Sequence, residues 1–162
     1  MDGQKISKAK RLITWAIAIG VLALVGFVFV KLAFGEVRTR EMVSIGSGVY
    51  RADVAETPNS RAKGLSGRRV LENDEAMLLV FDKNHHWSIW MKGMNFPIDI
   101  VWLDQKRVVN HIEYEVQPDK APHKVYEPPK PARYVLEIPA GQAKKSGIKV
   151  GVEAKFNKER YQ

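Results

Sequence analysis

The sequence predicts a mainly β (α+β) protein, with a compact, antiparallel, barrel-like sheet and two short helices, preceded by one transmembrane helix. Three observations lead to this prediction. An uncharged apolar segment of 19 residues lies near the N-terminus of the 162-residue chain. The rest of the chain alternates short apolar segments with turn-forming residues, a pattern typical of antiparallel sheets. Only two places in that part carry signals for a short helix.

The N-terminal apolar segment, residues 12–30, contains no charged side chain and only one polar side chain, that of Thr14. A helix of this length rises about 28 Å, close to the roughly 30 Å hydrocarbon core of a bilayer. Four basic residues precede the segment and Lys31 follows it. We therefore expect a single-pass membrane anchor over residues 12–34, with a cytoplasmic N-terminus and an extracytoplasmic domain.

A cleaved signal peptide is the competing interpretation of this segment. The small residues Ala33 and Gly35 fit a cleavage pattern. The apolar segment is, however, longer than the roughly 7–15 residues of a typical signal-peptide core. We favour the retained anchor for that reason.

The anchor divides the chain into five predicted parts. These are a basic tail over 1–11, the anchor over 12–34, a linker with the first strand over 35–46, a β-rich domain over 47–156 and a polar tail over 157–162.

Strands are predicted where β-branched, aromatic and aliphatic residues form short segments bounded by turn signals such as Gly46-Ser47-Gly48. The predicted strands are residues 42–45, 49–55, 76–81, 87–92, 98–103, 107–113, 134–138 and 149–156. Residues 82–86 are polar and are expected to form a loop. Residues 117–131 hold five prolines and are expected to form a long irregular loop with a binding or covering role.

The two helices are predicted from capping signals. Thr57 and Pro58 suit the N-cap and the first helical position, so a helix should run to about residue 65. A second helix is expected over residues 139–146, because Gly147 can cap its C-terminus.

The central stretch WSIWMKGMNFPIDIVWLD, residues 87–104, is rich in aromatic residues but contains Lys92 and Asp99. Charged side chains are costly to bury without a partner. Gly93 and Pro97 divide the stretch into two strand-length pieces. We expect the kink between them to bring the lysine and the carboxylate together.

The composition excludes some classes of function. There is no cysteine, which excludes disulfides, thiol catalysis and cysteine-ligated zinc. Of the net charge of +8, residues 1–35 carry half, with five basic side chains and one acidic side chain. The remaining residues mix 21 basic with 17 acidic side chains. Such a mixed surface argues against nucleic-acid binding.

Three blocks together resemble the bacterial and archaeal family called domain of unknown function 192 (DUF192). They are GLSGR at residues 64–68, IWMKGMNFPIDIVWLD at 89–104 and YVLEIPAGQAKKSGIKVG at 134–151. The resemblance covers residues 49–156 and implies a compact β-rich domain, often behind a signal or anchor segment. It implies no particular activity. The central block of the family commonly has a polar residue where this chain has Gly93, which weakens a catalytic interpretation.

Lys92, Asp99, Arg61 and Trp90 are the predicted ligand-binding residues. Lys92 and Asp99 could form a polar pair within a binding site, and Arg61 could hold an anionic group. The structural alternatives are an ion pair, a carboxylate that accepts backbone hydrogen bonds at the kink, and an arginine exposed on a helix.

The tryptophans and histidines can likewise be interpreted either as functional or as structural residues. Trp87, Trp90 and Trp102 could form an aromatic platform, although core packing explains them as well. His85 and His86 are adjacent and match no metal-binding spacing, so we expect neither a metal nor another cofactor.

The function we predict is that of an extracytoplasmic, non-catalytic module that binds a small ligand or an envelope protein. One alternative is a cell-envelope hydrolase that uses Asp99 with Lys92. Another is a purely structural or assembly factor.

Overall fold

The computed structural model describes residues 15–17, 19–27 and 39–157, of which 15–17 and 19–27 are helical. Within these described residues, no helix is long and apolar enough to cross a membrane. The predicted anchor over 12–34 lies partly outside them and stays a prediction. The predicted tail over 1–11 and all but the first residue of the tail over 157–162 also lie outside them.

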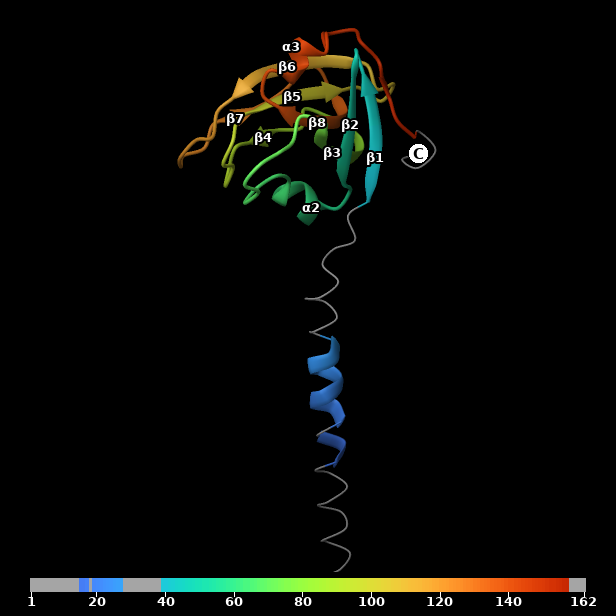
Figure 1. Cartoon of the computed structure of the whole chain (residues 1–162), viewed down its shortest axis with the longest axis vertical. Coiled ribbons are helices and arrows are strands. Elements are labelled where there is room, and N and C mark those ends of the chain that lie inside the picture. The colour runs from blue at the N-terminus through green and yellow to red at the C-terminus, as the bar shows by residue number, and fades with distance from the viewer. Residues whose placement is uncertain (1–14, 18, 28–38, 158–162) are drawn as a thin grey trace, which may run out of the picture. The chain divides into compact units, whose positions relative to one another are not determined.

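The β-rich part is built on a seven-stranded sheet with the order β6-β5-β8-β3-β2-β1-β9 (Figure 1). Its strands are β1 (Arg40–Ile45), β2 (Gly48–Ala55), β3 (Glu75–His85), β5 (Ile98–Leu103), β6 (Val109–Val116), β8 (Ala132–Pro139) and β9 (Ala154–Lys155). The sheet curls into a half-barrel, and Val109 N–H of the edge strand β6 donates at 2.9 Å to the carbonyl of Val152, which lies just before the other edge strand, β9. The mainly β fold class and the barrel-like curl are therefore as predicted.

One strand pair departs from the predicted antiparallel arrangement. β2 and β3 run parallel, with Ala52 beside Ala76 and Ala55 beside Leu79. Two parallel strands need a long connection, because the chain must return to the starting end of the first strand before it enters the second. Residues 56–74 supply this crossover, and they contain the helix α2 (Pro58–Lys63) and the GLSGR segment.

The predicted helix start at Thr57 is confirmed. The Thr57 Oγ1 accepts from Ser60 N–H at 3.1 Å, and the Ser60 hydroxyl oxygen accepts from Thr57 N–H at 3.0 Å. This reciprocal capping satisfies two backbone donors that a short helix would otherwise leave free. The second predicted helix is also present, as α3 (Gln142–Lys145).

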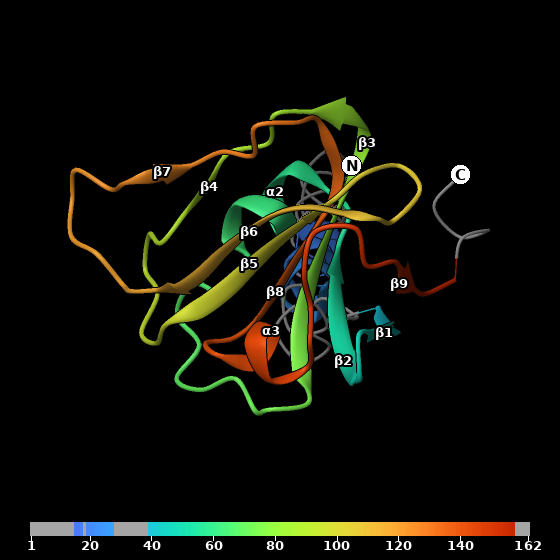
Figure 2. The same cartoon turned by 90° about the horizontal axis from the view of Figure 1, so that it is seen from above.

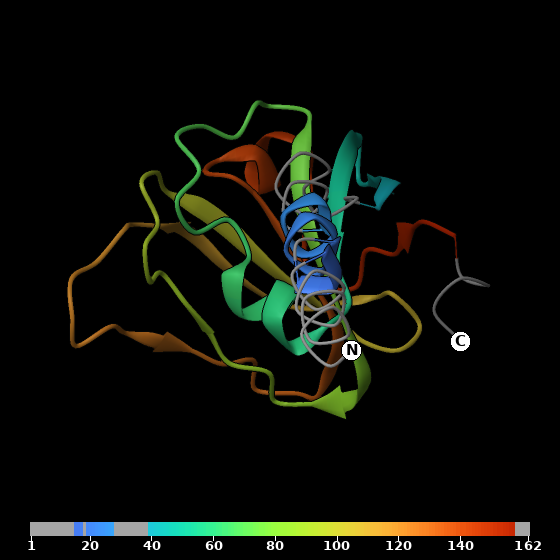
Figure 3. The ribbon, with the colours of Figure 1, turned by 90° about the horizontal axis from the view of Figure 1, so that it is seen from below.

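Both faces of the sheet are apolar, and each has its own cluster of buried side chains. The cluster enclosed by the curl includes residues from both edges, such as Ile112 of β6 and Ala154 of β9. The opposite face buries a second cluster, which includes Leu79, Ile100 and Val135. The crossover covers this second face, and Figures 2 and 3 show α2 lying across the strands there.

A separate two-stranded ribbon, β4 (Ile89–Trp90) with β7 (Val125–Tyr126), extends beside the main sheet (Figure 2). The predicted strand over 87–92 is therefore much shorter than expected. The proline-containing segment over 117–131 is not wholly irregular, because β7 pairs with β4. The pairing is limited to two residues on each side.

Other strand bounds also differ from the prediction; β6, for example, spans Val109–Val116 instead of residues 107–113. β3 continues to His85 through the polar residues 82–85, which were predicted to form a loop. Pairing of His85 with Ala132 of β8 holds this exposed extension. The predicted strand over 149–156 is reduced to β9, since residues before it form turns.

Candidate functional site

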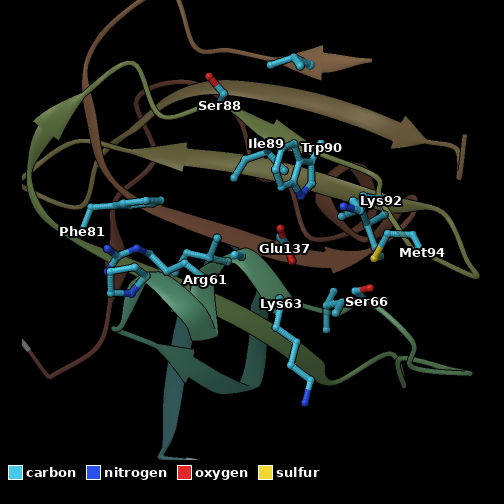
Figure 4. A pocket seen from close by; sticks show the side chains of 17 residues that line it. Arg61, Lys63, Ser66, Phe81, Ser88, Ile89, Trp90, Lys92, Met94 and Glu137 are labelled. Atoms are coloured by element: carbon cyan, nitrogen blue, oxygen red, sulfur yellow. The ribbon is translucent and has the colours of Figure 1, made fainter. Parts of the chain in front are cut away.

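A pocket of about 520 Å³ lies between α2, the segment that follows it, and the second face of the sheet. Figure 4 shows its side chains. Most of its walls are apolar, and they come from β3, β4, β5, β7, the loop between β4 and β5, and the crossover. The apolar lining residues are Pro58, Ala62, Leu65, Leu79, Phe81, Ile89, Trp90, Met94, Ile98 and Val125. Its volume falls within the roughly 300–1,000 Å³ that small-molecule sites occupy.

Glu137 of β8 is the acidic residue of the pocket lining. In Figure 4 it lies between Arg61 on one side and Lys92 on the other, with Ile89 and Trp90 across the pocket. Its side chain is only 5 % exposed. Among the described residues, no side chain or backbone group donates a hydrogen bond to its carboxylate. Burial raises the pKa of Glu137 to about 7, and the charge of Arg68 opposes this shift.

Arg68 cannot neutralise Glu137 fully, because it is also paired with another buried carboxylate. Its Nη2 lies 2.6 Å from Oδ2 of Asp53, which is 6 % exposed. Asp53 also accepts from Arg40 Nε at 3.1 Å. Arg68 therefore acts on Glu137 through its charge, while the hydrogen bond of its Nη2 goes to Asp53.

Lys92, one of the predicted ligand-binding residues, lines the pocket from the loop after β4. The loop is held against the GLSGR segment, since Gly67 N–H donates to the Gly93 carbonyl at 2.9 Å. Gly93 has a φ of +71°, and a Cβ there would lie 2.2 Å from Ser66 Oγ. The glycine at position 93 therefore allows the loop after β4 and the GLSGR segment to approach each other closely beside Lys92.

Arg61 and Trp90 also line the pocket, but they differ in what remains available for a ligand. Arg61 Nη1 donates to the carbonyl of Val80 at 2.8 Å and also to that of Glu56. Its guanidinium lies 4.8 Å from the centre of the Phe81 ring. Arg61 thus ties α2 to β3, whereas Trp90 is half exposed and can contact a ligand.

Asp99 lies away from the pocket and does not pair with Lys92, contrary to the predicted juxtaposition. Its side chain is fully buried. Oδ1 accepts from Glu115 N–H and Oδ2 from Ala143 N–H, both at 2.8 Å. Glu115 sits at an irregularity in the β5–β6 pairing with a φ of 53°, and Ala143 is in the first turn of α3. Asp99 therefore fulfils the structural alternative of a carboxylate bound to backbone groups.

Trp102 and Trp87, the other aromatic candidates, pack against neighbouring groups of the domain. Trp102 is fully buried, and its Nε1 donates to the Trp87 carbonyl at 2.9 Å. Trp87 stacks on Phe81 with ring centres 4.1 Å apart. Only Trp90 of the three predicted tryptophans lines the pocket. In the part of the chain that the structure describes, no group of three or more metal-ligating side chains occurs.

Glu137 was not among the sequence-predicted residues, although its signal resembles that of Asp99. It is a lone charge within the apolar segment YVLEI of a central strand. In an extended strand its side chain points to the same face as Val135 and opposite to Leu136. Val135 belongs to the cluster on the second face and Leu136 to the enclosed cluster. The Glu137 side chain therefore lies on the second face, where the pocket is.

The fold and the pocket together define a small β half-barrel domain with a ligand-sized cavity under a crossover helix. The chain belongs to the DUF192 family, described as "Uncharacterized ACR", whose sequence profile matches residues 41–156. The resemblance inferred from the three sequence blocks is thereby confirmed. Comparison with curated protein sequences gave no match.

Two solved structures are similar to this chain. A protein from Sinorhizobium meliloti 1021, described as a "putative transcription regulator", shares 26 % identity with a TM-score of 0.71 and covers 75 % of this chain and 98 % of its own. A protein of unknown function from Novosphingobium aromaticivorans shares 28 % identity with a TM-score of 0.66, over 73 % of this chain and 84 % of its own. Both agree with the half-barrel fold.

Replacing Asp99 by asparagine should lower the free energy of unfolding by about 2–4 kcal/mol, because one buried backbone N–H would lose its acceptor. Denaturant unfolding of the full chain in detergent, followed by tryptophan fluorescence, measures this. The control is Asp82→Asn, at an exposed carboxylate of β3, which should change it by less than about 0.5 kcal/mol. Equal midpoints for the Asp99 variant and the parent would contradict the backbone-binding role.

Glu137→Gln should change how stability depends on pH. The folded-state pKa of about 7 exceeds the ordinary glutamate pKa of 4.5, so the folded state binds more protons between these values. Stability of the parent should therefore fall as pH rises from 4.5 through 7, by up to about 3 kcal/mol from this group.

The glutamine variant lacks this contribution, so its stability relative to the parent should increase over the same pH window. Thermal unfolding at pH 5 and pH 8 tests this expectation. Glu56→Gln, at an exposed side chain, serves as the control and should follow the parent. Parallel pH profiles for the parent and Glu137→Gln would show that Glu137 does not titrate as described.

Proposed function

We propose that this protein is a membrane-anchored, extracytoplasmic module that binds a small ligand without catalysing a reaction. The observation that carries the binding proposal is the 520 Å³ apolar pocket lined by the Glu137 carboxylate, which accepts no hydrogen bond from a described residue. Polar groups inside a folded protein are nearly always hydrogen-bonded. A bound molecule would complete the hydrogen bonding of Glu137 while its apolar part contacts the walls.

The absence of catalysis is supported by the state of the charged groups near the pocket. Both oxygens of Asp99 are engaged by backbone N–H groups, so it cannot act with Lys92 as the predicted hydrolase would require. Ser88, a hydroxyl of the pocket lining, donates to the Glu127 carboxylate, and no described histidine lines the pocket. A serine–histidine pair of the kind that activates a hydroxyl nucleophile is therefore not formed among the described pocket residues, which include the hydroxyls of Ser66 and Ser88.

The membrane part of the proposal rests on the sequence of residues 12–34. The uncharged run over 12–30 has the length of a bilayer-spanning helix, and basic residues precede it. A tether would hold the pocket close to the membrane surface. The Sinorhizobium meliloti relative is described as a transcription regulator, a role that usually requires nucleic-acid binding. The basic side chains of the present chain are interleaved with acidic ones, so we do not propose this role for it.

Blocking the pocket should abolish binding of a small apolar probe. Ala62 is exposed on α2 and lines the pocket, so Ala62→Trp should fill the cavity without disturbing the core. Benzyl alcohol binding to the full chain in detergent can be followed by saturation-transfer NMR. We expect the probe signal to fall at least tenfold in this variant.

The matched control is Asn59→Trp, which adds the same side chain to the same helix at an exposed position outside the pocket lining. This variant should bind the probe as the parent does. Equal probe signals in the parent and both variants would rule out the pocket as a binding site.

The anchor should keep the whole chain in the membrane fraction. Expressed in a bacterial host, the chain should resist extraction by alkaline carbonate, and deletion of residues 12–34 should release it. A tag after Gln162 should be digested by protease added to spheroplasts, since we place the domain outside the cytoplasm. An intact mass corresponding to a chain that begins after residue 35 would instead demonstrate a cleaved signal peptide.

A further inference from the structure

The charges of the pocket are unevenly distributed. Its lining contains one acidic residue, Glu137, and three basic residues, Arg61, Lys63 and Lys92. Glu137 is buried against the sheet, whereas Lys63 and Lys92 are exposed. Apolar side chains lie between, so the pocket combines a buried carboxyl group, an apolar wall and a cationic rim.

The buried end of the pocket calls for a hydrogen-bond donor with positive charge. A carboxylate has about four acceptor positions, and those of Glu137 receive no donor among the described residues. Arg68 contributes charge, but its Nη2 is held 2.6 Å from Asp53. An ammonium group brings three N–H donors and a charge, and so matches what Glu137 lacks.

The basic rim of the pocket favours an anionic group, and Lys92 is the residue that can bind it. Its Nζ lies 5.9 Å from the centre of the Trp90 ring, and no described carboxylate pairs with it. Arg61 already donates to two backbone carbonyls and packs on Phe81. In Figure 4 the Lys63 side chain extends away from Glu137.

A simple cation is a poor fit to this arrangement. Three basic side chains in the lining repel it, and only Glu137 attracts it. A simple anion would meet the lysine but leave the buried carboxylate without donors. A molecule with both charges avoids both penalties.

We propose that the ligand is a zwitterion with an apolar body, of the amino-acid or short-peptide type, whose ammonium group binds Glu137 and whose carboxylate binds Lys92. This inference rests on the proposed ligand-binding function and specifies the ligand class. The apolar body lies against Leu79, Phe81, Ile98 and the Trp90 ring. The cavity of about 520 Å³ is large enough for a dipeptide with one aromatic side chain.

Three forms of one dipeptide separate the contributions of its two charges. Leucyl-phenylalanine has both charges, its N-acetyl derivative lacks the ammonium group, and its C-terminal amide lacks the carboxylate. Their apolar side chains are the same. Calorimetric titration of the full chain in detergent at pH 7 should show the unmodified dipeptide binding about 10- to 100-fold more tightly than either derivative.

Two variants assign each charge of the ligand to a residue. Glu137→Gln should weaken binding of the unmodified dipeptide and of its amide while leaving the N-acetyl form unchanged. Lys92→Met keeps the apolar stem and should weaken the unmodified and N-acetyl forms while leaving the amide unchanged. Lys149→Met, at an exposed lysine outside the pocket lining, is the matched control and should change none of the three affinities.

L-Phenylalanine distinguishes the two sources of the same chemistry, because both of its charges are on one carbon atom. Tighter binding than the dipeptide would assign the pocket to amino acids, and weaker binding would assign it to peptides. Either result, with the Glu137 and Lys92 dependence above, supports the zwitterion class.

Equal affinities for the three dipeptide forms would overturn the inference. If Ala62→Trp still abolished their binding, the pocket would remain a ligand site of another class. A third outcome is that none of the three dipeptide forms binds, while benzyl alcohol binds the parent and not Ala62→Trp. In that case the zwitterion class would fail and the pocket would remain a ligand site. If benzyl alcohol were also insensitive to Ala62→Trp, the proposed function would fail with it.

Discussion

A strongly curled sheet with apolar side chains on both faces must bury both faces, and this requirement organises the domain. Curling encloses the first face, where residues from β6 and β9 at opposite edges join one cluster. The second face lies on the outside of the curl, so another element must cover it. The parallel crossover between β2 and β3 provides that cover, since it carries α2 and the GLSGR segment across the strands. The pocket is the part of the second face that this cover leaves unfilled.

Two carboxylates on neighbouring strands illustrate how the two faces differ. Asp99 of β5 pairs in register with Ile138 of β8, one position from Glu137. On the enclosed face, a bulge in β6 and the first turn of α3 supply two N–H donors to Asp99. On the covered face, Glu137 meets apolar walls and an arginine already held by Asp53. One carboxylate is therefore part of the scaffold, while the other is available to a bound molecule.

The sequence was sufficient where a structural signal is local. The strand over 98–103 has the predicted bounds, and the capping pattern at Thr57 locates α2. Signals that depend on tertiary pairing were missed. The polar end of β3 forms a strand because β8 lies beside it, and β7 forms because β4 does. The parallel β2–β3 pair likewise has no short-range signature.

The site was predictable only in part, for a related reason. Lys92 and Trp90 stood out because a cation and an aromatic side chain interrupt an unusual stretch, and both line the pocket. Asp99 stood out for the same reason but is satisfied by backbone donors from distant segments. Whether a buried charge is structural or available depends on which partners reach it. That information comes from β6, α3 and the crossover, not from residues near Asp99 or Glu137 in the chain.

The energetic cost of Glu137 argues that the carboxylate is more than a packing feature. An ionised carboxylate without donors in an apolar setting destabilises the folded state, and a domain of this size has only about 5–15 kcal/mol of stability. Arg68 offsets part of this cost through its charge, but Asp53 holds its guanidinium. A leucine or glutamine at position 137 would remove the ionic penalty. The folded domain thus accepts a loss of stability at this pocket. Such a loss is typical of binding sites, because the unmet group is satisfied only when the ligand arrives.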